Sequence, residues 1–193
     1  MKYGKRLREE IERCLPEWRG EFISYKQLKK QLNLIDPVSR AKKRSRISIE
    51  DLLHAGNGRV DVNFMRFTQL LDVELHKVNT FYIDKEEDYV IRLKELKNME
   101  ANLCCRETML NLQKSILDFH AEMVCLLHYS VLNSTGFRKI VKKQKKRASS
   151  SNVQFNSVPR VLDQPFLSTE LLYNLMKECE AMLYRLFPRT EPK

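Results

Sequence analysis

A long stretch from Val60 to Leu103 contains neither Gly nor Pro, and this feature most constrains the fold. Apolar residues recur along it at helical spacing, for example Phe67, Leu71 and Val78. No run of alternating β-branched residues competes with this pattern. At about 1.5 Å per residue, one helix over this stretch would run roughly 60 Å. The stretch therefore predicts an extended helical bundle.

A second long helical pattern follows from about Glu107 to Lys146. Gly136 lies inside it, where Gly costs about 1 kcal/mol relative to Ala. We expect a close helix–helix contact at Gly136, with a kink as the alternative.

The N-terminal part predicts a helical hairpin. Leu7, Ile11 and Cys14 repeat at helical spacing in a first helix from Tyr3 to Cys14. Pro16 interrupts that helix and can open the next one, which we expect to continue to about Leu34. The short link makes the two helices neighbours.

The remaining segments are shorter. We expect loops at 36–59 and 148–158, because both are polar and broken by turn-forming residues. A short helix is predicted at 159–164, and a final amphipathic helix follows a cap-like sequence at 168–170 and ends at Phe187.

These patterns predict one all-α domain over residues 1–187, followed by a tail at 188–193. Its architecture is an N-terminal helical hairpin packed on a bundle with two long helices and a C-terminal helix.

Composition limits the partners and the compartment. The 35 basic and 25 acidic residues leave a net charge of +10, which points to an anionic partner. The five Cys residues show no CxxC spacing, so we expect reduced thiols in a nuclear or cytosolic protein. No apolar run approaches the length of a membrane span, and the N-terminus is too charged for a signal peptide.

The sequence offers no catalytic centre. The four His residues are scattered, and pairs such as Cys125 with His128 supply only two of the four ligands of a closed zinc site. HExxH, GxSxG and Gly-rich phosphate loops are all missing. We therefore expect a protein that is not an enzyme and has no metal or other cofactor.

The strongest charge feature is the run from Phe137 to Arg147, where seven of the ten residues from Arg138 are basic. Four of its lysines share one helix face: Lys139, Lys142, Lys143 and Lys146. Like charges at these spacings repel by a few tenths of a kcal/mol per pair. The run fits either a solvated basic face or a site for a polyanion.

Two further basic groups lie near the N-terminus. Tyr25 and Lys29 are four residues apart and share a helix face, where a hydroxyl beside an ammonium suits a phosphate oxygen. The other members of these groups are Lys2, Lys5, Arg6, Lys26 and Lys30. Convergence of these groups with the run from Phe137 would make one site for several phosphates.

Three segments of the chain resemble the motifs of the SPX domain family. They are MKYGKRLREEIERCLPEWRGEFISYKQLKKQL at the start, NSTGFRKIVKKQKKR in the second long helix and VLDQPFLSTELL near the C-terminus. The resemblance covers nearly the whole chain and is closest to the stand-alone SPX proteins of plants. It implies binding of inositol polyphosphates, such as inositol hexakisphosphate or inositol pyrophosphates, as a sensor of cellular phosphate status.

The resemblance also implies residue roles and a partner. Tyr25, Lys29 and Lys143 look like the family's phosphate-binding cluster, and Lys139, Lys142 and Lys146 like the lysines around it. Lys2 and Lys26 lie where family members add contacts. The implied partner is a MYB coiled-coil phosphate-starvation transcription factor, inhibited in the nucleus or cytoplasm without direct contact of this chain with DNA or membrane.

One residue departs from the family pattern, since Lys145 stands where many members have Asp. This change makes the surface more basic. The cluster from Lys42 to Arg46 lies outside the resembling motifs, and we interpret it as a nuclear-import patch.

Two other interpretations remain open. The chain could be the regulatory part of a larger ubiquitin ligase, polyphosphate polymerase or phosphate transporter. A basic helix could also bind nucleic acid, although the run from Phe137 lacks interleaved aromatic residues and has few Asn or Gln residues for reading bases.

Overall fold

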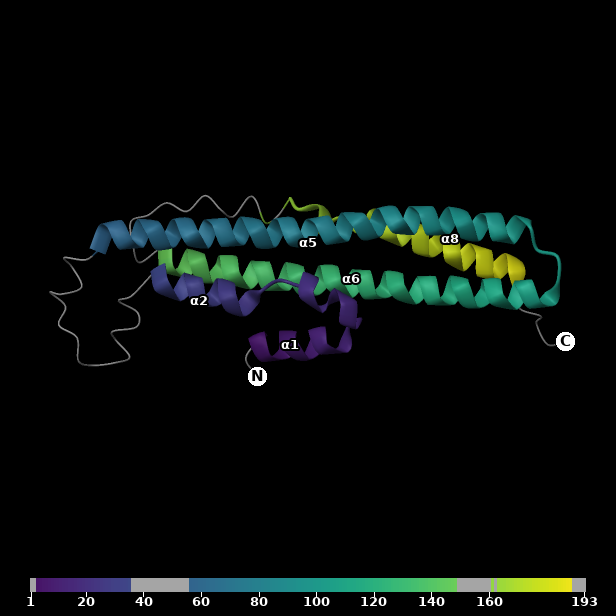
Figure 1. Cartoon of the computed structure of the whole chain (residues 1–193), viewed down its shortest axis with the longest axis horizontal. Coiled ribbons are helices and arrows are strands. Elements are labelled where there is room, and N and C mark those ends of the chain that lie inside the picture. Colours follow the sequence, from purple (N-terminus) through teal and green to yellow (C-terminus); the bar gives the residue numbers. More distant parts are fainter. Residues whose placement is uncertain (1–2, 36–55, 149–160, 162, 189–193) are drawn as a thin grey trace. The chain divides into compact units, whose positions relative to one another are not determined.

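The computed structural model describes residues 3–35, 56–148, 161 and 163–188. Every element within these ranges is a helix, so the predicted all-α class is confirmed (Figure 1). The cluster from Lys42 to Arg46 lies outside the described residues, as does most of each predicted loop. Residues 159, 160 and 162 of the short helix predicted at 159–164 lie outside them as well, and the described residues 163 and 164 are not helical.

The N-terminal part contains three elements where the sequence predicted two. Helix α1 spans Tyr3–Arg13, a 3-10 helix η1 spans Pro16–Glu21, and helix α2 spans Tyr25–Ile35. The prediction of one continuous helix from Pro16 to Leu34 was therefore wrong. Phe22 has extended backbone angles, because the backbone between η1 and α2 forms hydrogen bonds with side chains of the long helices.

The two long helices match their predictions closely. Helix α5 spans Gly56–Ala101, so the last four residues of the predicted loop at 36–59 are helical. Helix α6 spans Arg106–Ala148. A 3-10 helix η2 (Pro165–Leu167) and the final helix α8 (Glu170–Leu186) complete the described chain.

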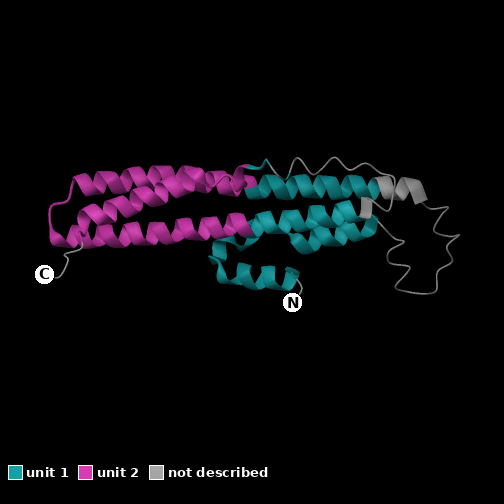
Figure 2. Cartoon of the chain, turned by 180° about the vertical axis from the view of Figure 1, so that it is seen from behind, with its two compact units in different colours: residues 1–78, 132–164 teal, residues 79–131, 165–193 magenta. Residues whose placement is uncertain are grey.

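The chain divides into two compact units, and α5 and α6 each contribute a segment to both (Figure 2). Unit 1 comprises residues 1–78 and 132–164, and unit 2 comprises residues 79–131 and 165–193. The single domain inferred from the sequence stays a prediction.

In unit 1, apolar side chains of α1, η1 and α2 pack with those of α5 and α6. Trp18 of η1 is 2 % exposed. Further buried residues are Leu7, Phe22, Ile23, Leu28, Leu32, Phe67, Leu71, Phe137 and Ile140. Burial of this apolar surface stabilises the unit and fixes the α2 face that carries Tyr25.

In unit 2, α8 packs on α5 and α6 through Leu172, Leu175, Cys179 and Met182. The segment that leads into α8 is also hydrogen-bonded. The Tyr82 hydroxyl donates to the carbonyl of Ser168, and the Ser130 hydroxyl donates to the carbonyl of Phe166.

Gly136 lies at a close contact, as its position in the α6 sequence predicted. A Cβ atom there would come within 2.9 Å of the Ile23 Cγ2 atom. The neighbour is the segment between η1 and α2, whereas the sequence suggested another helix. Glycine thus allows α6 to approach the start of α2.

No helix within the described ranges is long and apolar enough to cross a membrane.

Candidate anion-binding site

A pocket of about 470 Å³ in unit 1 is surrounded by lysines. It is lined by Tyr3 and Gly4 of α1, Tyr25 and Lys29 of α2, and Lys139, Lys142, Lys143 and Lys146 of α6. Hereafter these eight residues are called the basic pocket. No carboxylate is among them, so the five ammonium groups give the lining a strong positive charge.

Six of the eight residues predicted for a ligand site meet in this pocket: Tyr25, Lys29, Lys139, Lys142, Lys143 and Lys146. Lys26 is exposed on α2 and does not line the pocket. Lys2 lies outside the described residues. The predicted convergence of α2 with the basic run of α6 is therefore present, while the ligand-binding role of these residues stays a prediction.

The other basic residues noted in the sequence lie apart from the lining. Lys5 is exposed and pairs with Glu9 at 3.8 Å. Arg6, Lys30 and Lys145 are exposed and do not line the pocket.

Two lysines of the basic pocket lie over aromatic rings. The Lys143 Nζ atom is 5.4 Å from the centre of the Tyr25 ring, and the Lys139 Nζ atom is 4.8 Å from that of Tyr3. The two rings meet edge to face with their centres 4.9 Å apart. The face of an aromatic ring carries partial negative charge and attracts an ammonium group. The two rings therefore hold these lysines at the pocket without adding a formal negative charge to its lining.

Besides Gly4, Tyr3 is the lining residue that the sequence did not reveal as part of a site. Its hydroxyl donates a hydrogen bond to the Leu132 carbonyl of α6 at 3.2 Å. Burial, with a smaller contribution from Tyr25, raises the pKa of Tyr3 to about 12, so the hydroxyl stays a neutral donor at physiological pH. A single tyrosine in the first turn of a helix carries no signal of this role, and only the approach of α1 to α6 reveals it.

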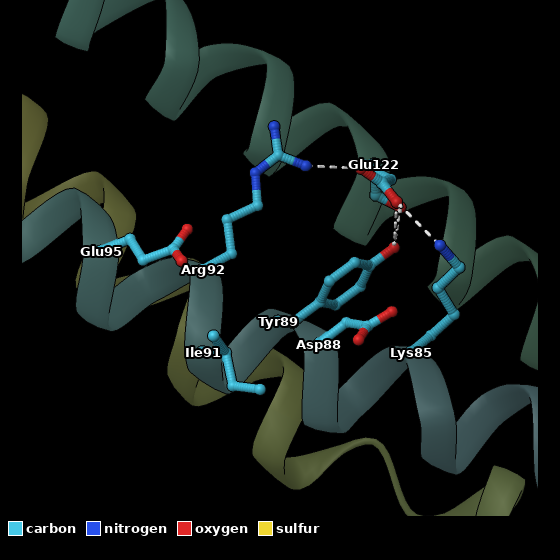
Figure 3. Close-up of a pocket in the computed structure, with 7 residues that line it drawn as sticks. All are labelled: Lys85, Asp88, Tyr89, Ile91, Arg92, Glu95 and Glu122. Carbon is cyan, nitrogen blue, oxygen red and sulfur yellow. Dashed lines mark hydrogen bonds and ion pairs between the residues drawn. The ribbon is translucent and has the colours of Figure 1, made fainter.

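Unit 2 has a second cavity, of about 330 Å³, in which opposite charges compensate (Figure 3). Glu122 accepts a hydrogen bond from the Tyr89 hydroxyl at 3.2 Å and pairs with Arg92 at 2.8 Å. Lys85 pairs with the same carboxylate at 3.4 Å. This network joins α5 to α6 and lacks the one-sided charge of the basic pocket.

Within the residues that the structure describes, no group of three His, Cys, Asp or Glu side chains is placed to hold a metal ion.

Comparison with known sequences gives consistent matches. Residues 1–61 match the family model described as SPX domain. The chain is 46 % identical over 200 residues to SPX domain-containing protein 2 of Arabidopsis thaliana, a match that covers 100 % of this chain and 68 % of that protein. It is 44 % identical over 192 residues to SPX domain-containing protein 1 of the same plant, covering 99 % and 73 % respectively.

A solved structure has a similar fold. It is the SPX domain of Chaetomium thermophilum glycerophosphodiester phosphodiesterase 1 in complex with inositol hexakisphosphate. The match has a TM-score of 0.70 and 25 % sequence identity, and it covers 96 % of this chain and 99 % of the fungal domain.

Proposed function

This chain belongs to the SPX domain family, and on that premise we propose that its basic pocket binds inositol polyphosphates, including inositol hexakisphosphate and inositol pyrophosphates. The observation that carries the proposal is the convergence of five lysines from α2 and α6 on one pocket whose lining contains no carboxylate. The inositol hexakisphosphate in the fungal SPX domain supports the choice of ligand.

The chemistry of the basic pocket suits a compact ligand with several phosphates. Lysines at 139, 142, 143 and 146 repel one another on one face of α6, and a polyanion between them would relieve that repulsion. Ammonium groups donate charge-assisted hydrogen bonds to phosphate oxygens. We assign Lys143, Lys29 and Tyr25 to one phosphate group, and Lys139, Lys142 and Lys146 to its neighbours.

We further propose that the liganded protein acts by binding and not by catalysis, as a sensor of cellular phosphate status. In this proposal it holds a MYB coiled-coil phosphate-starvation transcription factor away from DNA, in the nucleus and cytoplasm. The similarity to plant SPX domain-containing proteins supports this choice. The ligand would act by favouring the partner-binding state of the chain.

Replacing Lys143 with Ala tests the ligand. We expect Lys143→Ala to weaken the binding of inositol hexakisphosphate roughly tenfold or more, about 1.4 kcal/mol, because one charge-assisted contact is lost. Isothermal titration calorimetry measures the affinity, and circular dichroism checks that helix content is unchanged.

Lys114→Ala is the matched control, since it removes an exposed lysine from the unit 2 part of the same helix. Its affinity should stay within about threefold of the original, because Lys114 does not line the basic pocket. Equal affinities of the two variants for inositol hexakisphosphate would contradict the assignment of Lys143 to the binding site.

The partner is tested by a pull-down of a MYB coiled-coil factor in the presence and absence of inositol hexakisphosphate. We expect capture only with the ligand and only with an intact Lys143. Capture that is independent of the ligand would contradict the proposal that the ligand controls partner binding.

The fungal structure comes from a domain of a phosphodiesterase, which favours a second candidate, a regulatory domain of a larger protein. Determining whether the natural reading frame continues beyond Lys193 distinguishes this candidate from the stand-alone sensor.

A further inference from the structure

We propose that Glu74, Lys77 and Asn133 are positioning residues that hold the start of α2, and with it Tyr25 and Lys29, in register with the lysines of α6. These three residues are hereafter called the α2 clamp. The inference rests on the proposed binding of inositol polyphosphates by the basic pocket, to which it adds residues outside the lining.

The α2 clamp contacts three consecutive residues. The Lys77 ammonium donates to the Phe22 carbonyl at 2.8 Å, and the Ile23 N–H donates to the Asn133 Oδ1 atom at 2.8 Å. The Ser24 N–H donates to the Glu74 Oε2 atom at 2.7 Å. Each bond joins this segment to α5 or α6, so the backbone just before Tyr25 is fixed from two helices.

Two of the three residues of the α2 clamp are buried, which makes their hydrogen bonds costly to break. Asn133 is fully buried and Glu74 is 5 % exposed. The Glu74 Oε2 atom also pairs with the Lys77 ammonium at 3.0 Å, so one oxygen contacts both the Ser24 N–H and the Lys77 ammonium. A buried polar group that loses its partner destabilises the arrangement more than a surface group does.

The clamped segment is continuous with the basic pocket. The Ser24 carbonyl accepts hydrogen bonds from the amides of Gln27 and Leu28, so Ser24 is the residue from which α2 starts. Tyr25 follows directly, and Lys29 lies one turn later on the same face. A shift of Ser24 would therefore displace both side chains that α2 contributes to the pocket.

Asn133 and the close contact at Gly136 link the same segment to α6. Asn133 binds the Ile23 amide, and Gly136 lets the Ile23 side chain approach the helix. Lys139 and Lys143 follow on the same rigid helix, so the bond between Ile23 and Asn133 sets their distance from Tyr25. A multidentate ligand needs both halves of the pocket at the correct separation, which neighbouring residues normally enforce.

The experiment compares three variants of the full chain by titration with inositol hexakisphosphate. Glu74→Ala should weaken binding roughly tenfold, because the Ser24 amide and the Lys77 ammonium both lose their acceptor. Glu74→Gln should restore affinity to within about threefold of the original, because one amide oxygen can accept from both donors.

Glu122→Ala is the matched control, because it removes a carboxylate that pairs with two basic residues in unit 2 (Figure 3). It should lower stability while leaving the affinity unchanged. Three results would each overturn the inference: original affinity in Glu74→Ala, no recovery in Glu74→Gln, or an equal loss of affinity in Glu122→Ala.

Lys77→Met is the milder variant should Glu74→Ala fail to fold, because the Lys77 side chain is 27 % exposed and methionine keeps its apolar stem. Its affinity should fall at least about threefold, since the Phe22 carbonyl loses its donor. Affinity equal to that of the original chain would overturn the inference.

Hydrogen exchange separates failure of this inference from failure of the proposed function. If the unaltered chain does not bind inositol hexakisphosphate, the proposed ligand is wrong, and the α2 clamp is judged by exchange at residues 22–24. Faster exchange there in Glu74→Ala, with recovery in Glu74→Gln, supports the α2 clamp. Unchanged exchange overturns it.

Discussion

Tyr3 connects α1 to the basic pocket through one side chain. Its ring lies under the Lys139 ammonium and meets the Tyr25 ring edge to face, while its hydroxyl donates a hydrogen bond to the Leu132 carbonyl. The hydroxyl can be removed while the ring is kept, and comparison with a variant that lacks both gives the contribution of the ring to ligand affinity.

For Tyr3, we expect the ring to matter more than the hydroxyl. Tyr3→Phe should keep affinity for inositol hexakisphosphate within about threefold, whereas Tyr3→Leu should lose several-fold, because a cation–π contact contributes about 0.5–1 kcal/mol. Calorimetry of the two variants measures this difference. A loss in Tyr3→Phe as large as that in Tyr3→Leu would instead assign the main role to the bond with Leu132.

At the scale of elements, the approach of α6 to the start of α2 depends on Gly136. Gly136→Ala should destabilise unit 1, because overpacking costs about 1–3 kcal/mol and the gain in helix propensity offsets only about 1 kcal/mol of it. Hydrogen exchange of the unit 1 amides at equilibrium measures this change.

Gly20→Ala is the control for this prediction. A Cβ atom at Gly20 has no neighbour within 4 Å, so alanine fits there without a clash. The variant should keep the free energy of unfolding or raise it slightly, because alanine reduces the conformational entropy of the unfolded chain. A destabilisation equal to that of Gly136→Ala would show that the contact with Ile23 is unimportant.

The interruption between η1 and α2 shows where prediction from the sequence reached its limit. Trp18, Phe22 and Tyr25 keep a helical spacing across it, so local periodicity favours one continuous helix. The interruption is stabilised by Glu74 and Asn133, which lie 50 and 110 residues away along the chain from their partners. A pattern read over neighbouring residues cannot contain this information.

The long helices and the lysine face were predictable for the opposite reason. The period of α5 and the spacing of Lys139, Lys142, Lys143 and Lys146 are local properties of the sequence. The meeting of Tyr25 and Lys29 with these lysines was expected from the family resemblance, and Tyr3 and Gly4 became visible only in the folded chain.

At the scale of the whole molecule, all residues of the basic pocket belong to unit 1. A ligand that binds only the folded state stabilises it by about 2.7 kcal/mol at a concentration 100-fold above its Kd. Local opening should therefore slow mainly in unit 1 when inositol hexakisphosphate is added.

Native-state hydrogen exchange tests this prediction. We expect slower exchange in α1, in residues 22–24 and in the unit 1 part of α6, with little change in α8. Equal protection of both units would contradict a site confined to unit 1.

The burial of Trp18 has a spectroscopic consequence. It is the only tryptophan of the chain, and it lies in η1, four residues before the segment that the α2 clamp holds. Tryptophan emission from the unlabelled chain therefore originates at this one position. A red shift would report water reaching η1, so loosening of the N-terminal elements can be followed optically during a ligand titration.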